Sequence, residues 1–176
     1  MRLLVTGGAG FIGSTFVRRV LQGAEPTLAS ADVVVLDKLT YAGNGANLAP
    51  VATHPALRFV KGDITDESLV ADLMVGVDVV VHFAAESHVD RSILGADPFV
   101  VTNVVGTQIL LQAALDAGVS RFVHISTDEV YGSIESGSWP ENHLLEPNSP
   151  YSASKASADL LVRAYARTHG MDVRVT

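Results

Sequence analysis

Cysteine is absent from the 176-residue sequence. Its absence excludes a disulfide framework, a thiolate zinc site and a catalytic thiol, and we expect a protein of the reducing cytoplasm. Positive charge is also scarce, because 12 Lys and Arg residues stand against 19 Asp and Glu residues and leave a formal net charge of -7. Such a chain has no basic surface that could hold a phosphate backbone, so we expect no nucleic-acid partner.

Long hydrophobic runs are missing too. No apolar run approaches the ~18 residues that a membrane span requires, and the start of the chain does not resemble a signal peptide. We therefore expect no membrane partner. Hydrophobic residues nevertheless make up 48% of the chain and charged residues 18%, which is typical of a globular protein with a buried core. The length fits one domain, or a piece of a larger one.

Short apolar runs alternate along the chain with segments of helical period, which are repeatedly followed by a glycine. Strands are expected at 3–5, 33–36, 57–60, 77–83, 121–126 and 172–176. Helices are expected at 12–20, 66–75, 98–117 and 150–169, the last two opened by Asp97-Pro98 and Ser149-Pro150. Strands that are apolar throughout indicate helices on both faces of a parallel sheet. The predicted fold class is therefore α/β, a doubly wound Rossmann-type sheet that stops after about the sixth strand.

A glycine-rich turn lies between the first strand and the first helix, with glycines at Gly7, Gly10 and Gly13. Glycines at these positions allow a tight turn and let a pyrophosphate approach the helix N-terminus, where free N–H groups and the helix dipole favour negative charge. A lone glycine pattern is weak, but its place between a strand and a helix favours a dinucleotide site over an ordinary connecting turn.

An acidic residue, Asp37, closes the second strand. A carboxylate there can accept the hydroxyls of an adenosine ribose and would repel a 2'-phosphate, which favours NAD over NADP. The neighbouring Lys38 weakens this argument, because a cation could tolerate the phosphate. Asp63-Ile64 follows the third strand, where the adenine is expected to lie.

Tyr151 and Lys155 are four residues apart at the start of a predicted helix, so both side chains emerge on one face. A tyrosine can act as a base near neutral pH only if a nearby cation stabilises the phenolate. Ser126-Thr127 ends the fifth strand, and in open α/β sheets ligands bind beyond the carboxyl ends of strands. The Thr127 hydroxyl could therefore bond a substrate oxygen beside Tyr151.

Two adjacent acids follow this hydroxyl in Ser126-Thr127-Asp128-Glu129-Val130-Tyr131-Gly132. They could be solvated loop charges. A hydride transfer alone needs neither carboxylate, whereas an elimination needs both a base and an acid. Asp128 and Glu129 thus favour an elimination.

Taken together, these segments resemble the extended branch of the short-chain dehydrogenase/reductase superfamily, and within it the dTDP-D-glucose 4,6-dehydratase family. The resemblance covers the whole chain and rests also on three further segments: Asp37-Lys38-Leu39-Thr40-Tyr41-Ala42-Gly43-Asn44, His82-Phe83-Ala84-Ala85-Glu86-Ser87-His88-Val89-Asp90-Arg91-Ser92 and Pro147-Asn148-Ser149-Pro150-Tyr151. UDP-glucose 4,6-dehydratases carry similar motifs, so the motifs are more specific for the reaction than for the nucleotide base.

The resemblance implies NAD as cofactor and a nucleotide sugar as substrate. It implies cofactor contacts at Gly7, Gly10, Phe11, Ile12, Gly13, Asp37, Lys38, Thr40, Asp63, Ile64, Ala84, Ala85, Ser87, Thr102, Tyr151 and Lys155. It implies catalytic roles for Thr127, Asp128, Glu129, Tyr151 and Lys155. No histidine spacing suggests a metal site, and none is expected.

Family members also continue well beyond a sixth strand into a substrate domain, which this chain lacks, so residues 1–176 are interpreted as the NAD-binding domain carrying the catalytic residues. The resemblance implies a homodimer formed through the helices 98–117 and 150–169. Two other functions stay open: a UDP-hexose 4-epimerase, against which Asp128 and Glu129 argue, and a non-catalytic dinucleotide-binding module, against which Thr127, Tyr151 and Lys155 argue.

Overall fold

A six-stranded parallel sheet forms the centre of the protein in a computed structural model that describes residues 1–176. Its strands are β1 (Arg2–Thr6), β2 (Asp32–Asp37), β3 (Leu57–Lys61), β4 (Val79–His82), β5 (Arg121–His124) and β6 (Val173–Val175). Their order is β3-β2-β1-β4-β5-β6, and every neighbouring pair is parallel. The order reverses between β1 and β4, which creates a crevice at the carboxyl ends of the strands. The predicted doubly wound α/β fold is confirmed.

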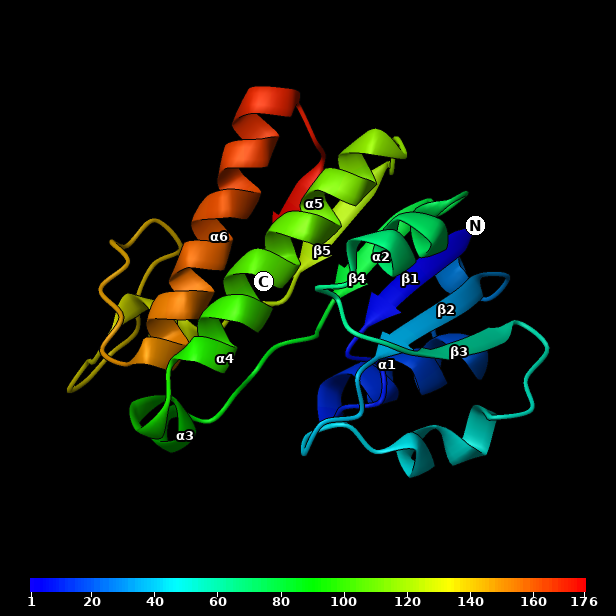
Figure 1. The fold of residues 1–176 in the computed structure, drawn as a ribbon, viewed down its shortest axis with the longest axis horizontal. Helices are drawn as coiled ribbons and strands as arrows, with labels where there is room; N and C mark the ends of the chain where they lie inside the picture. Colours follow the sequence, from blue (N-terminus) through cyan, green and yellow to red (C-terminus); the bar gives the residue numbers. More distant parts are fainter.

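Helices cover both faces of this sheet (Figure 1). They are α1 (Phe11–Leu21), α2 (Glu67–Met74), α3 (Val89–Leu94), α4 (Asp97–Phe99), α5 (Thr107–Asp116) and α6 (Pro150–His169). Shorter helical turns are η1 (Pro26–Leu28), η2 (Gly45–Val51), η3 (Val100–Gly106) and η4 (Asp128–Tyr131). One core joins α2, α5 and α6 to one face of the sheet, and a second core joins α1 and η2 to the other. Alternate strand residues supply the two cores, as the period of two in a strand requires.

The predicted helix 98–117 is one helical stretch with an irregular middle. It begins at α4, continues through η3, which is a π-helix, and ends in α5. Ala96 rather than Asp97 occupies the N-cap position, and Asp97 is the first helical residue. By contrast, Ser149 caps α6 as predicted: its side chain accepts from the Ser152 amide, and the Ser152 hydroxyl accepts from the Ser149 amide. This reciprocal capping box fixes where α6 begins.

The stretch Asp97–Asp116 is also long and apolar enough to cross a membrane, judged by length and composition alone. The expectation that no stretch approaches the length of a membrane span is therefore wrong by this criterion. Its inner residues Ile109, Leu110, Leu111 and Ala114 are buried in the larger core, so packing within the domain accounts for the apolar inner face. Its outer face keeps three valines, Val100, Val101 and Val105, exposed.

Candidate active site

The glycine turn between β1 and α1 leaves no room for side chains. Gly7 has a φ of +69°, and a Cβ there would lie 2.6 Å from the Ala84 amide nitrogen. A Cβ on Gly13 would lie 2.4 Å from the Gly7 carbonyl oxygen. No acidic residue stands in the first turn of α1. The backbone is therefore open to an anion at the helix N-terminus, as a dinucleotide pyrophosphate requires.

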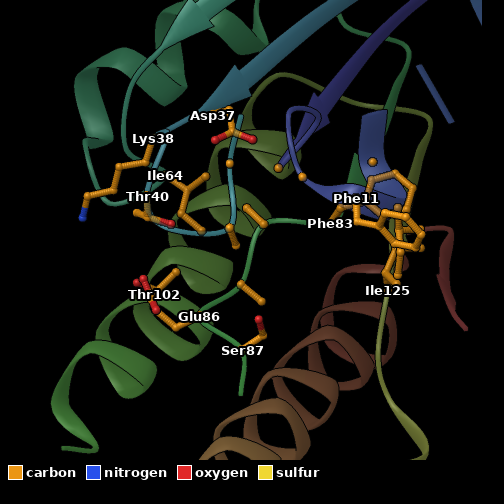
Figure 2. Close-up of a pocket in the computed structure, with 18 of the residues that line it drawn as sticks. Phe11, Asp37, Lys38, Thr40, Ile64, Phe83, Glu86, Ser87, Thr102 and Ile125 are labelled. Atoms are coloured by element: carbon orange, nitrogen blue, oxygen red, sulfur yellow. The ribbon is translucent and has the colours of Figure 1, made fainter. Parts of the chain in front are cut away.

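Asp37, at the end of β2, is buried and held by two backbone amides. Its Oδ2 accepts from the Ala9 amide at 2.8 Å, and its Oδ1 accepts from the Leu39 amide at 2.8 Å. These bonds tie the end of β2 to the glycine turn and aim the carboxylate at the cleft (Figure 2). The charge and position match those of an acid that binds an adenosine ribose.

A cavity of about 460 Å³ opens beyond the carboxyl ends of β1, β2, β4 and β5. Every residue that the sequence predicted for cofactor binding lines it: Gly7, Gly10, Phe11, Ile12, Gly13, Asp37, Lys38, Thr40, Asp63, Ile64, Ala84, Ala85, Ser87, Thr102, Tyr151 and Lys155. The glycine turn, Asp37 and the hydroxyl-bearing residues Thr102 of η3 and Tyr151 of α6 thus share one cavity. The residues present fit a nicotinamide dinucleotide.

Ser126, which the sequence placed at the ligand end of the fifth strand, also lines the cavity. Several other lining residues were not assigned to the site. They include Phe83, Glu86, His88 and Ile125. Figure 2 labels Phe83, Glu86 and Ile125 among the side chains that line the cavity. All of them stand at or just past the ends of β4 and β5, so their position after a strand was the signal that could have identified them.

The loops that follow β2 and β4 are joined across the cavity by Tyr41. Its hydroxyl donates to the Ser87 carbonyl at 2.7 Å and accepts from the Ser87 amide at 3.2 Å. The Arg91 guanidinium lies 3.7 Å from the centre of the Tyr41 ring, in a cation–π contact. The two walls of the cavity are therefore fixed to each other by side-chain contacts as well as by the sheet.

Asn103, which the sequence analysis missed, anchors one wall of the cavity. This buried residue of η3 accepts from the Glu86 amide at 2.8 Å and donates to the Glu86 carbonyl and to Ser154 Oγ. It thus connects the loop after β4 to α6. A π-helical turn is often found at functional sites, and here it places Asn103 inward while Thr102 lines the cavity.

The candidate catalytic residues come from two elements that meet at the cavity. Tyr151 stands in the first turn of α6 and Lys155 one turn later, while Thr127 caps the short helix η4 and accepts from the Glu129 amide at 3.2 Å. Asp128 and Glu129 form the exposed start of η4 and do not line the cavity itself. Tyr151 and Lys155 thus line the cavity, whereas Thr127, Asp128 and Glu129 lie beside it, at the cap and the start of η4, which packs against α6.

Electrostatics at Tyr151 differ from the sequence-based expectation. Burial raises the pKa of Tyr151, and the Glu129 and Asp128 carboxylates raise it further, against the Thr127 hydroxyl, which lowers it. Lys155 is not among the groups that shift this pKa. Its Nζ donates to the Ile125 carbonyl at 2.6 Å, at the end of β5. Both acids belong to η4, which packs against α6, the helix that carries Tyr151.

No group of three or more His, Asp or Glu side chains is placed to hold a metal ion.

Residues 4–176 match the family model described as GDP-mannose 4,6 dehydratase. A dTDP-glucose 4,6-dehydratase of Streptomyces niveus is 60% identical over 176 residues, which are 100% of this chain and 52% of that protein. One from Streptomyces antibioticus is 63% identical over 177 residues, again 52% of its length. The chain therefore spans about half the length of the curated relatives it matches.

Solved structures agree with the sequence relatives. The dTDP-glucose 4,6-dehydratase DesIV of Streptomyces venezuelae, crystallised with NAD, superposes with a TM-score of 0.97 at 68% identity, over 99% of this chain and 54% of that one. A UDP-glucose 4-epimerase of Thermus thermophilus, in complex with NAD, superposes at 0.88 but with 31% identity, over 99% of this chain and 54% of its own. Because the family model covers nearly the whole chain, and the closely similar proteins named above share its cavity-forming fold, the protein belongs to the 4,6-dehydratase family of the extended short-chain dehydrogenases/reductases.

Proposed function

We propose that the complete protein is an NAD-dependent lyase that converts dTDP-D-glucose to dTDP-4-keto-6-deoxy-D-glucose and water. The observation that carries this proposal is the pair of acids, Asp128 and Glu129, in a short helix that packs against α6, beside the cavity that Tyr151 lines. Sequence identity near 60% to dTDP-glucose 4,6-dehydratases supports the dTDP sugar over the GDP sugar of the family model's description.

The reaction begins with oxidation at the sugar C4. Tyr151 removes the proton of the C4 hydroxyl, and Thr127 holds the C4 oxygen with its hydroxyl. Lys155 is buried one turn after Tyr151 on the same face of α6, where it lines the cavity and contacts the cofactor. A bound NAD+ would supply the hydride acceptor for C4 and, once reduced, the hydride donor for C6. The C4 ketone that results acidifies the proton on C5.

Elimination follows at C5 and C6. Glu129 removes the C5 proton while Asp128 protonates the C6 hydroxyl, which leaves as water. Glu129 then returns a proton to C5 as C6 is reduced, so that the product is a 4-keto-6-deoxy sugar. A rim position suits this work, because the two acids must reach carbons beyond the one that Tyr151 serves.

We further propose that residues outside this Rossmann domain grip part of the nucleotide sugar, because the chain spans about half the length of its relatives. A homodimer is proposed through the outer faces of α4–α5 and α6, which lie side by side in Figure 1. The exposed Val100, Val101, Val105 and Leu160 give these helices an apolar outer face. The cytoplasm is the proposed compartment.

Fold similarity does not separate a dehydratase from a 4-epimerase, since both superpose well. The two activities are distinguished by their reaction products. The complete protein is incubated with dTDP-glucose and with UDP-glucose, and the products are analysed by mass spectrometry and sugar chromatography. A dehydratase yields a product lighter by one water that carries a 4-keto group. An unchanged mass with a new C4 epimer would establish the epimerase instead, and binding of NAD without any product would establish a non-catalytic module.

A further inference from the structure

Behind the proposed catalytic pair lies a buried polar cluster that the reaction as described does not use. It contains Asp159 on α6 and His124 on β5, which are 5% and 0% exposed. Asp159 follows Lys155 by four residues, as Lys155 follows Tyr151, so the three side chains lie along one face of α6. Carboxylates are rarely this buried unless a partner compensates their charge.

The hydrogen bonds of Asp159 are incomplete. Ser126 Oγ donates to its Oδ2 at 2.6 Å. His124 Nε2 lies 3.1 Å from its Oδ1, but the two are not aligned as a hydrogen bond, and Oδ1 has no other partner. Burial lowers the pKa of His124 despite the nearby carboxylate, so the imidazole is neutral near pH 7. His124 therefore does not supply the positive charge that Asp159 needs.

Lys155 is the buried cation on the same helix face. It is 4% exposed, its Nζ donates to the Ile125 carbonyl, and its side chain lines the cavity. Burial lowers the pKa of Lys155 to about 8, and the Asp159 charge opposes that lowering. A neutral amine would lose its attraction for the phenolate formed at Tyr151.

We propose that Asp159 is a positioning residue for the Tyr151–Lys155 pair: its buried carboxylate stands one helical turn beyond Lys155 on the same face of α6 and, through Ser126 Oγ, fixes the end of β5 next to Thr127. This inference rests on the proposed function, since it gives Asp159 a part in the same C4 oxidation. The other titratable groups around the pair are His82 from β4, His124 from β5, Tyr151 from α6, and Asp128 and Glu129 from η4. Burial lowers the pKa of both histidines and the two acids are exposed, so Asp159 is the buried carboxylate on the helix face of Lys155.

The test replaces Asp159 by Asn in the complete protein, which removes the charge but keeps an oxygen that can accept from Ser126. Titration of Lys155 is followed by trace acetylation with acetic anhydride between pH 6 and about pH 10, read at the Lys155 peptide by mass spectrometry. We expect the midpoint to fall by about one pH unit in Asp159→Asn. An unchanged midpoint would overturn the proposal.

A second readout follows the same charge through the reaction. Single-turnover formation of reduced nicotinamide with dTDP-glucose should be near normal at pH 6 in Asp159→Asn, because Lys155 is charged there in both proteins. At pH 8 it should be about fivefold slower, because the variant has lost most of its ammonium form. An equal loss at both pH values would show a merely structural role.

Three further variants sharpen the result. Asp159→Glu keeps the charge and should keep the Lys155 midpoint, whereas Asp72→Asn, on the exposed face of α2, should change neither readout. Ser126→Ala keeps the carboxylate, so it should keep the midpoint and slow the oxidation equally at all pH values. If Asp159→Asn does not fold, the other two variants decide. A Lys155 titration midpoint displaced in Ser126→Ala overturns the proposal. A Lys155 midpoint preserved in both Ser126→Ala and Asp159→Glu supports it. If the wild type does not turn over dTDP-glucose, the proposed function fails while the acetylation still decides the role of Asp159.

Discussion

Lys38 and Asp63 form an ion pair at the edge of the cofactor cavity, with 2.6 Å between Nζ and Oδ2. Burial opposes ionisation of Asp63, but the hydrogen bonds from Lys38 and Thr65 outweigh it, so the pKa of Asp63 is lowered. Lys38, the cation next to Asp37 in the sequence, is thus already paired with the Asp63 carboxylate. This arrangement removes the main objection to an NAD preference, which was that Lys38 would accept a 2'-phosphate.

We therefore expect the protein to bind NAD+ at least about tenfold more tightly than NADP+. The cause is the Asp37 carboxylate, which accepts ribose hydroxyls and repels a phosphate. Isothermal titration calorimetry with both dinucleotides measures the ratio. Asp63→Asn should release Lys38 and raise the NADP+ affinity about tenfold, while Asp72→Asn should not. Equal wild-type affinities for the two cofactors would contradict the role given to Asp37.

Gly13→Ala should reduce NAD+ affinity at least about tenfold. The added Cβ would stand 2.4 Å from the Gly7 carbonyl, so the turn must move away from the helix N-terminus that receives the pyrophosphate. The matched control is Gly45→Ala, whose Cβ meets nothing within 4 Å. Fluorescence titration of the two variants with NADH checks this. Comparable affinities would show that the glycine turn can accommodate a Cβ at position 13.

Glu129→Gln should still oxidise C4 but accumulate reduced nicotinamide, because Tyr151 is untouched and removal of the C5 proton is slow. Asp128→Asn should also retain C4 oxidation and lose about 10²- to 10⁴-fold in elimination, the usual contribution of a general acid. Stopped-flow absorbance in a single turnover, with deuterium wash-in at C5, separates the steps.

Tyr151→Phe is the comparison for both acids, and it should fail before any reduced nicotinamide forms. Parental turnover of dTDP-glucose in both carboxylate variants would mean that Asp128 and Glu129 are ordinary loop charges. The dehydratase proposal would then lose its main support at residue level.

Val105→Asp should convert the proposed dimer to a monomer at micromolar concentration. A charge placed in an apolar helix interface is desolvated without a partner, which costs several kcal/mol, roughly two or more orders of magnitude in association. Light scattering coupled to size exclusion measures the mass. Leu144→Asp, an equally drastic change at an exposed loop residue, should leave the dimer intact. A monomeric wild type would remove the basis for this interface.

Acid should destabilise the fold through His82 and His124. Burial lowers both pKa values, and for His82 the positive charges of His124 and Lys155 add to that lowering. Below pH ~6.5 the unfolded chain therefore binds more protons than the folded one. The free energy of unfolding is fully retained above that pH. As the pH drops toward the folded pKa values, it falls by up to ~1.4 kcal/mol per pH unit for each histidine. Urea denaturation between pH 7.5 and pH 5 should show a flatter dependence in His82→Gln than in wild type or in the exposed control His169→Gln. Identical slopes would rule out this source.

Much of the fold could be predicted because strand and helix periods are strong where a whole face is buried. The four strands from β1 to β4 and the cap of α6 follow directly from apolar runs and from Ser149-Pro150. The short helix α3 was missed because six residues carry no usable period, and it follows His88, whose φ is +78°. The π-helical geometry of η3 was missed because its valines give the same apolar sequence pattern as an ordinary α-helix.

The lining of the cavity was predicted better than its supports. Glycines, Asp37 and Tyr151 stand at strand ends or in recognisable turns, where local sequence indicates their position. Asn103 and Asp159 lie within helices, and only the packing of α6 against β5 and the loop after β4 shows what they contact. Residues that act through long-range contacts carry no local signal.

The capping box at Ser149 and Ser152 has a consequence for motion as well as for structure. Tyr151 sits in the first turn of α6, and terminal turns are where helices fray. A capping interaction is worth about 1 kcal/mol, which corresponds to roughly a fivefold difference in how often that turn opens. The lifetime of the phenol in its working position is therefore governed in part by two serine hydroxyls, one of them buried, in addition to the hydrophobic core beneath the helix.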